Sequence, residues 1–221
     1  MPLSTLILIV ANLVPLAGVV FWGWDVFVLL ILYWLETAVI CFWTMVRVLI
    51  MPRPERDAAT AKVGATQPVS GIGAALFLTV HAGIFMTVHF LFLWSLFAGV
   101  WAASIHGPAE FVSQIVLGTG LWLPLGILFV VRGWYTLRPL ILGEPDPEAD
   151  RDVLTGLYTR IVVMQVAIIF GGWLAMLTGG SIATLALLVV GKTLVEAFGL
   201  RLSGNADGAA AKAVAERDKG G

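Results

Sequence analysis

Six long apolar segments, each almost free of charged residues, constrain this chain more than any other feature of its sequence. They occupy residues 3–22, 26–50, 74–99, 111–131, 157–178 and 181–201. A membrane-spanning helix needs about 20 consecutive apolar residues, and every segment meets that length. We therefore predict an all-α polytopic membrane protein, with six transmembrane helices in one bundle over residues 1–202 and a flexible cytoplasmic tail over 203–221.

The distribution of lysine and arginine predicts how the bundle is oriented. Of the 13 basic residues, all but Lys192 flank the second and fourth loops or follow the last span, and the other three loops carry none. Because positive charge is concentrated in cytoplasmic loops, we expect both termini in the cytoplasm and the protein in the bacterial inner membrane. Trp134 and Tyr135 suit the aromatic belt at the inner interface, and Pro124 is expected to kink the fourth span.

Ionisable side chains inside the predicted spans are the candidate functional residues, because such groups usually face the bundle interior and pair there. Two uncharged polar residues accompany them. The set comprises Glu36, His81, His89, Lys192, Glu196, Asn12 and Tyr33. We expect these residues to line one polar cavity in the middle of the membrane. Lys192 and Glu196 lie one helical turn apart and are expected to form an ion pair.

Metal binding is one chemistry open to this cluster, with His81, His89, Glu36 and Glu196 as candidate ligands. The two histidines are about 12 Å apart along a regular helix, so they cannot share one metal ion. No zinc-hydrolase or di-iron spacing occurs, so no motif requires a cofactor. The single cysteine excludes an intramolecular disulfide, and no run of basic residues indicates nucleic acid as a partner.

A stripe of small residues in the fifth span predicts close helix packing. It consists of Ala167, Gly171, Ala175 and Gly179. We favour packing inside the bundle, with a homodimer seam or a contact to a membrane-complex partner as the alternatives. The polar stretch between the second and third spans is interpreted as a linker, and Asp150 or Asp152 as the cap of the fifth helix.

Three short motifs resemble those of an uncharacterised family of six-helix bacterial and archaeal membrane proteins, a domain of unknown function. They are YWLE at 33–36, HAGIF at 81–85 with His89, and GKTLVE at 191–196. The resemblance covers most of residues 5–202 and implies a six-helix bundle with these polar positions. In addition, Phe85 and His89 look like the FxxxH element of membrane-embedded prenyl-protein proteases, but Glu36 is single and Ile40 stands where that family has arginine.

Three functions remain open from the sequence. We favour binding or transport of a small solute or proton, since a histidine can titrate near neutral pH. A membrane-embedded metal-dependent enzyme and an accessory subunit of a membrane complex are the alternatives. No motif decides whether the protein is an enzyme, and we favour a non-enzymatic function. The lipid bilayer is an expected partner.

Overall fold

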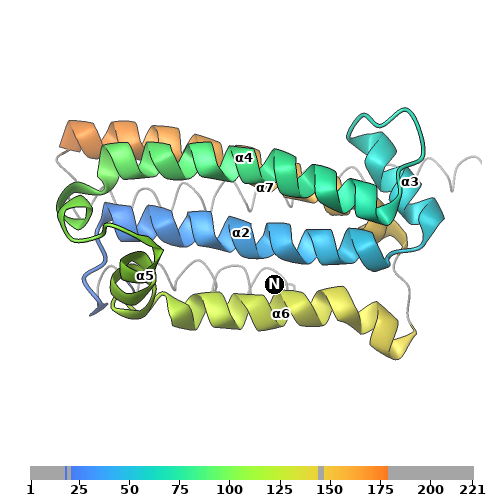
Figure 1. Ribbon diagram of the computed structural model, residues 1–221, viewed down its shortest axis with the longest axis horizontal. Coiled ribbons are helices and arrows are strands. Elements are labelled where there is room, and N and C mark those ends of the chain that lie inside the picture. The colour runs from blue at the N-terminus through green and yellow to red at the C-terminus, as the bar shows by residue number, and fades with distance from the viewer. Residues whose placement is uncertain (1–17, 19–20, 144–146, 179–221) are drawn as a thin grey trace, which may run out of the picture.

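Four long helices packed side by side form the body of the protein (Figure 1). The computed structural model describes residue 18, residues 21–143 and residues 147–178. The long helices are α2 (Val26–Ile50), α4 (Gly71–Phe97), α6 (Trp122–Leu142) and α7 (Pro147–Thr178). Shorter elements connect them: α3 (Arg53–Lys62), η1 (Gly99–Ala103), α5 (Pro108–Glu110) and the π-helical η2 (Phe111–Leu117). The prediction of an all-α chain is confirmed for the described residues.

The four long helices correspond to the second to fifth predicted spans. In Figure 1, α2 and α6 run in one direction along the bundle, while α4 and α7 run in the opposite direction. The first predicted span, apart from residues 18, 21 and 22, lies outside the described residues. So do the sixth span and the tail at 203–221.

Helix α2 forms the centre of this arrangement and contacts α4, α6 and α7. It is the most deeply buried helix: four consecutive residues, Leu29 to Leu32, are fully shielded. A helix buried on nearly every side must be apolar nearly all round, which is what the sequence of α2 provides. Asp25 fixes its start, because its carboxylate accepts hydrogen bonds from the backbone of Val28 and from the indole of Trp101, both at 2.8 Å.

The outer helices expose large apolar side chains along much of their length. On α4 this surface includes Leu76, Val80, Ile84, Val88 and Leu91, which recur every three or four residues. Extended exposed apolar surface of this kind marks a contact with lipid or protein. Among the described residues, α2 and α4 are each long and apolar enough to cross a membrane, and a third span results if the bent pair at 108–117 and 122–139 is counted as one.

A sharp bend interrupts the predicted fourth span at 111–131. Helical segments before and after the bend meet at 91°, so the helix after the bend, α6, begins only at residue 122. Gly120 has a φ of +80°, a conformation that glycine adopts without steric cost. Pro124, expected to kink this span, instead lies in the first turn of α6, where its missing N–H breaks no helical hydrogen bond.

The predicted linker between the second and third spans contains an ordered helix, α3. Arg56, Ala59 and Thr60 are buried on one side of it, and that side packs against α7. Arg56 also donates to the carbonyl of Val69 at 3.0 Å, which ties the connection to the start of α4. This end of the bundle is therefore more extensively packed than a linker would be.

Candidate functional site

His89 is a buried histidine with an unusual hydrogen-bonding state. It is 5% exposed and lies on α4 along the buried positions Ala82, Met86 and Leu93. Its Nδ1 is 2.8 Å from the carbonyl oxygen of Phe85, and only a protonated nitrogen can donate to a carbonyl. Neutral His89 therefore carries its lone pair on Nε2. That atom is buried and has no hydrogen-bond partner among the described residues.

His81 occupies a different environment, although it lies on the same helix. Its side chain is exposed, stacks on Phe77 at a centroid separation of 5.3 Å, and meets the ring of Tyr158 edge-on at 5.8 Å. Tyr158 belongs to α7, so His81 faces the junction of α4 and α7. The two histidines are thus separated, as their spacing requires.

Tyr33 and Glu36 lie on the central helix, near the level of His89. The indole of Trp34 donates to the carbonyl of Met86 at 2.8 Å, which sets the register between α2 and α4 at this level. Tyr33 is buried in the same core cluster as Met86, and Glu36 is half-buried. Glu36 precedes Arg47 by eleven residues, or three turns and about 20°, so both lie on one face of α2, the face that meets α6 and α7.

Several predicted residues cannot be placed. Asn12, Lys192 and Glu196 lie outside the described residues, as does the expected pair between the last two. Of the small-residue stripe, Ala167, Gly171 and Ala175 belong to α7 and Gly179 falls outside the described part. Within the described residues, no group of three or more His, Cys, Asp or Glu side chains is arranged to hold a metal ion.

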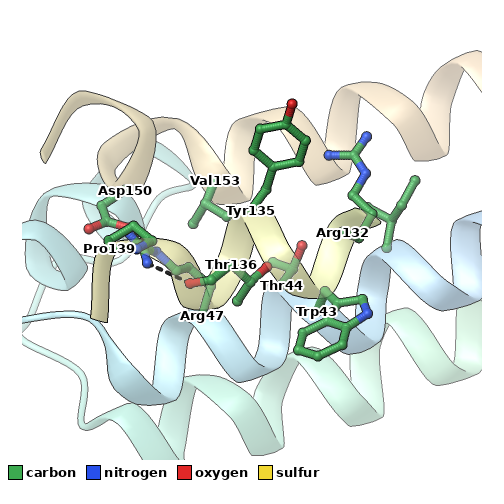
Figure 2. Close-up of a pocket in the computed structure, with 10 residues that line it drawn as sticks. Trp43, Thr44, Arg47, Arg132, Tyr135, Thr136, Pro139, Asp150 and Val153 are labelled. Atoms are coloured by element: carbon green, nitrogen blue, oxygen red, sulfur yellow. Dashed lines mark hydrogen bonds and ion pairs between the residues drawn. The ribbon is translucent and has the colours of Figure 1, made fainter. Parts of the chain in front are cut away.

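A polar cavity of about 260 Å³ lies between α2, α6 and α7, close to the end of the bundle that carries α3 (Figure 2). Its polar lining comes from Thr44 and Arg47 of α2, Arg132, Tyr135 and Thr136 of α6, and Asp150 of α7. Trp43 closes part of its wall and packs against Phe129 at a centroid separation of 5.0 Å. A cavity with convergent polar groups is a candidate binding site.

Arg47 joins the three helices around this cavity. Its Nε forms a buried ion pair with the carboxylate of Asp150, and its Nη1 donates to the carbonyl of Thr136 at 2.9 Å, the bond drawn in Figure 2. Arg47 is 9% exposed and Asp150 is 3% exposed. Both charges are therefore largely removed from solvent, and their mutual attraction is correspondingly strong.

Sequence reasoning missed this cavity, because Arg47 was assigned to a loop flank and Asp150 to a helix cap. The structure places Asp150 within the first turns of α7, paired with Arg47, and Asp152 paired with Lys62. One signal was available: Arg47 lies three residues inside the apolar run that ends at 50, where a charge needs a partner. The spacing of residues does not reveal which acid pairs with Arg47, because that pairing depends on the tertiary structure.

Comparison with known proteins places the chain in a family. The model of the Family of unknown function (DUF6498) matches residues 2–219, nearly the whole chain. The protein belongs to this family. The resemblance drawn from the YWLE, HAGIF and GKTLVE motifs is thereby confirmed as a match to a domain of unknown function. No curated protein and no solved structure matches this DUF6498 chain.

Proposed function

We propose that this protein is a multi-pass protein of the bacterial inner membrane, with both termini in the cytoplasm, that binds a small polar solute or a proton at a site built around His89. One observation carries the proposal: the Nε2 atom of His89 is buried and lacks a hydrogen-bond partner among the described residues. A buried polar atom left without a partner costs about 1–3 kcal/mol, so it calls for an explanation, and a bound solute or proton supplies one.

The surroundings of His89 suit the capture of a proton or a hydrogen-bond donor. The bond from Nδ1 to Phe85 holds the ring in the tautomer whose Nε2 accepts, and the phenyl ring of Phe85 lies 4.0 Å from the imidazole between centroids. A ring fixed in this way presents its lone pair in one direction and needs little reorganisation when a donor arrives.

A pair of matched variants tests the proposal. The full chain is reconstituted in vesicles that contain a pH-sensitive dye, and proton entry is driven by a potassium diffusion potential. We expect wild-type flux above that of empty vesicles, a large loss in His89→Gln, and retention in His81→Gln, which removes the same side chain from an exposed position of the same helix.

Two results would contradict this function. Equal proton flux in vesicles with the wild type, in vesicles with His89→Gln and in empty vesicles would exclude proton transport as the function. Stoichiometric metal in the purified wild-type protein, lost in His89→Gln, would favour the metal-dependent alternative instead, with His89 as a ligand.

A further inference from the structure

A second buried acceptor lies on α7, in the side chain of Gln165. Its Oε1 is shielded from solvent and has no hydrogen-bond partner among the described residues, the same state as Nε2 of His89. Gln165 extends the buried row of α7, because it follows Leu154, Leu157 and Ile161 at intervals of three and four residues. A buried amide oxygen in this state calls for an explanation.

His89 and Gln165 lie at nearly one height in the bundle. Helices α4 and α7 run in the same direction (Figure 1), and the rings of His81 and Tyr158 meet at 5.8 Å between centroids. From that contact, His89 lies eight residues further along α4 and Gln165 seven residues further along α7. At about 1.5 Å per residue, these are rises of about 12 Å and about 10.5 Å, so the heights differ by about 1.5 Å.

The central helix α2 gives an independent measure of both heights, because it runs antiparallel to α4 and α7. The hydrogen bond from Trp34 to Met86 places the histidine, three residues beyond Met86, level with position 31 of α2. The ion pair of Arg47 with Asp150 places the glutamine, fifteen residues beyond Asp150, level with position 32. The two registers therefore agree on one layer of the bundle.

Both residues also lie on helix faces that meet at the junction of α2, α4 and α7. At about 100° per residue, His89 is turned about 80° from His81, which faces α7, towards the buried row of α4. Gln165 is turned only about 20° from Tyr158, towards the buried Ile161. Ile161 belongs to a core cluster that contains residues of all three helices. The two acceptors are therefore grouped around one junction.

Two acceptors cannot bond to each other, so this arrangement calls for a donor between them. A proton taken up by Nε2 of His89 supplies one, because it converts the lone pair into an N–H group that can donate to the carbonyl of Gln165. Nδ1 carries its hydrogen in both states and keeps its bond to Phe85. The proton is the smallest species that can join the two acceptors, and both atoms are shielded from solvent.

The surrounding segments of α2, α4 and α7 carry other titratable groups at different heights. Tyr33 lies about 3 Å from the level of His89 and Glu36 about 7.5 Å, whereas Cys41, Tyr158 and His81 lie about 10 Å or more towards the end with α3. On these three helices, within one turn of this level, the described titratable groups are thus an imidazole and a phenol. Of the two, the imidazole gains a proton near neutral pH.

We propose that the species bound at His89 is a proton, and that Gln165 is the second binding residue, which accepts the hydrogen bond from the protonated Nε2. This assignment rests on the function proposed above and adds to it the identity of the bound species and its partner on α7. Uptake of the proton forms a bond between α4 and α7, and release of the proton breaks that bond.

The test applies the vesicle assay of proton flux to variants of Gln165. Gln165→Leu removes the acceptor and is expected to lower the flux by about 10-fold or more, the usual effect of losing a hydrogen bond to a charged group. Gln165→Glu keeps an acceptor oxygen and should retain most of the flux. Thr159→Val removes a polar group from an exposed position of the same helix and should leave the flux unchanged.

The melting temperature of the full chain in detergent separates proton binding from a structural role. At about pH 8, where an imidazole is mostly neutral, Gln165→Leu removes a buried oxygen that has no partner, so the melting temperature should stay the same or rise. A glutamine that held the helices together would instead give a fall. The double variant of His89→Gln with Gln165→Leu should lose no more flux than His89→Gln alone, because both changes remove one interaction.

The outcomes distinguish this assignment from the function on which it rests. Loss of flux in His89→Gln with wild-type flux in Gln165→Leu overturns the role of Gln165 and leaves the site at His89 intact. Wild-type flux no higher than that of empty vesicles overturns the proton itself as the bound species. A lower melting temperature together with lost flux in Gln165→Leu assigns a structural role and also overturns the proposal. If Gln165→Leu does not yield folded protein, wild-type flux in Gln165→Met is the refuting result.

Discussion

Replacement of Asp150 by asparagine is the most informative perturbation of this fold. The substitution keeps the shape of the side chain but removes the negative charge that faces Arg47. Because the two residues are 3% and 9% exposed, the guanidinium would remain buried without its counter-charge. Breaking a buried ion pair in this way costs about 3–5 kcal/mol.

The chain contains a matched control two residues away. Asp152 also bridges α7 to another helix, through Lys62 of α3, but its side chain is 65% exposed and that of Lys62 is 47% exposed. Exposed ion pairs contribute only about 0–1 kcal/mol, because solvent screens the charges and ordering two side chains costs entropy. Asp152→Asn therefore removes the same chemical group from the same helix with a much smaller expected loss.

The assay is thermal unfolding of the purified chain in detergent. For a chain of this size about 3 kcal/mol corresponds to a fall in melting temperature of roughly 6–12 °C, so Asp150→Asn should fall by at least that amount and Asp152→Asn by no more than a few degrees. The double variant Arg47→Met with Asp150→Leu should recover most of the loss, since an apolar pair of similar volume leaves no buried charge. Equal melting temperatures for the two single asparagine variants would refute the reasoning.

Two further predictions concern packing and topology. Gly133→Ala should destabilise the protein by about 1–3 kcal/mol in the same melting assay, because a Cβ there would lie 2.5 Å from the Trp43 ring, whereas Gly126→Ala, which meets no atom within 4 Å, should stabilise it by about 0.5–1 kcal/mol; equal changes would disprove the close approach. In a cysteine-free background, a membrane-impermeant maleimide should label cysteine at position 103 (replacing Ala103) in intact spheroplasts, and at position 67 (replacing Gln67) only after lysis. The reverse pattern would invert the predicted orientation.

Two of the helices were predicted from sequence almost to the residue. The apolar runs at 26–50 and 74–99 became α2 at 26–50 and α4 at 71–97. Each starts directly after a residue whose side chain accepts a backbone N–H of the first turn, Asp25 in one case and Ser70 in the other. Hydropathy finds the length of such a helix and the capping residue finds its start, so both signals are local.

The bend before α6 shows where hydropathy alone is insufficient. Residues 111–131 form one continuous apolar run, and an average over that run does not register a change of direction. The signal lies in Gly118 and Gly120, because the first leaves no room for a Cβ beside Gln114 and the second adopts a positive φ. A pair of glycines with one residue between them marks a turn more directly than Pro124 marks a kink.

The arrangement of the candidate site residues likewise depends on tertiary packing that the sequence pattern does not show. That His89 is buried and His81 is not follows from which side of α4 packs on α2, and no periodicity identifies that side in a helix that is apolar all round. The cavity with Arg47 and Asp150 depends on residues 103 positions apart in the chain. Such pairing is fixed by the packing of α7 against α2, and only the tertiary structure reveals it.

The position of charge on α2 connects these observations. Glu36 and Arg47 share the face of α2 that meets α6 and α7, about 16 Å apart along the axis. The opposite face, with Trp34, Cys41 and Val48, carries no carboxylate and no basic side chain, and it packs on α4 and its neighbours. A buried central helix that confines its charged residues to one face favours the packing of α6 and α7 on that side, where Arg47 bonds to Thr136 and Asp150. It leaves α4 to contribute a histidine to an otherwise apolar contact. The polar face of α2 thus accounts for both the cavity at one end of the bundle and the separation of that cavity from His89.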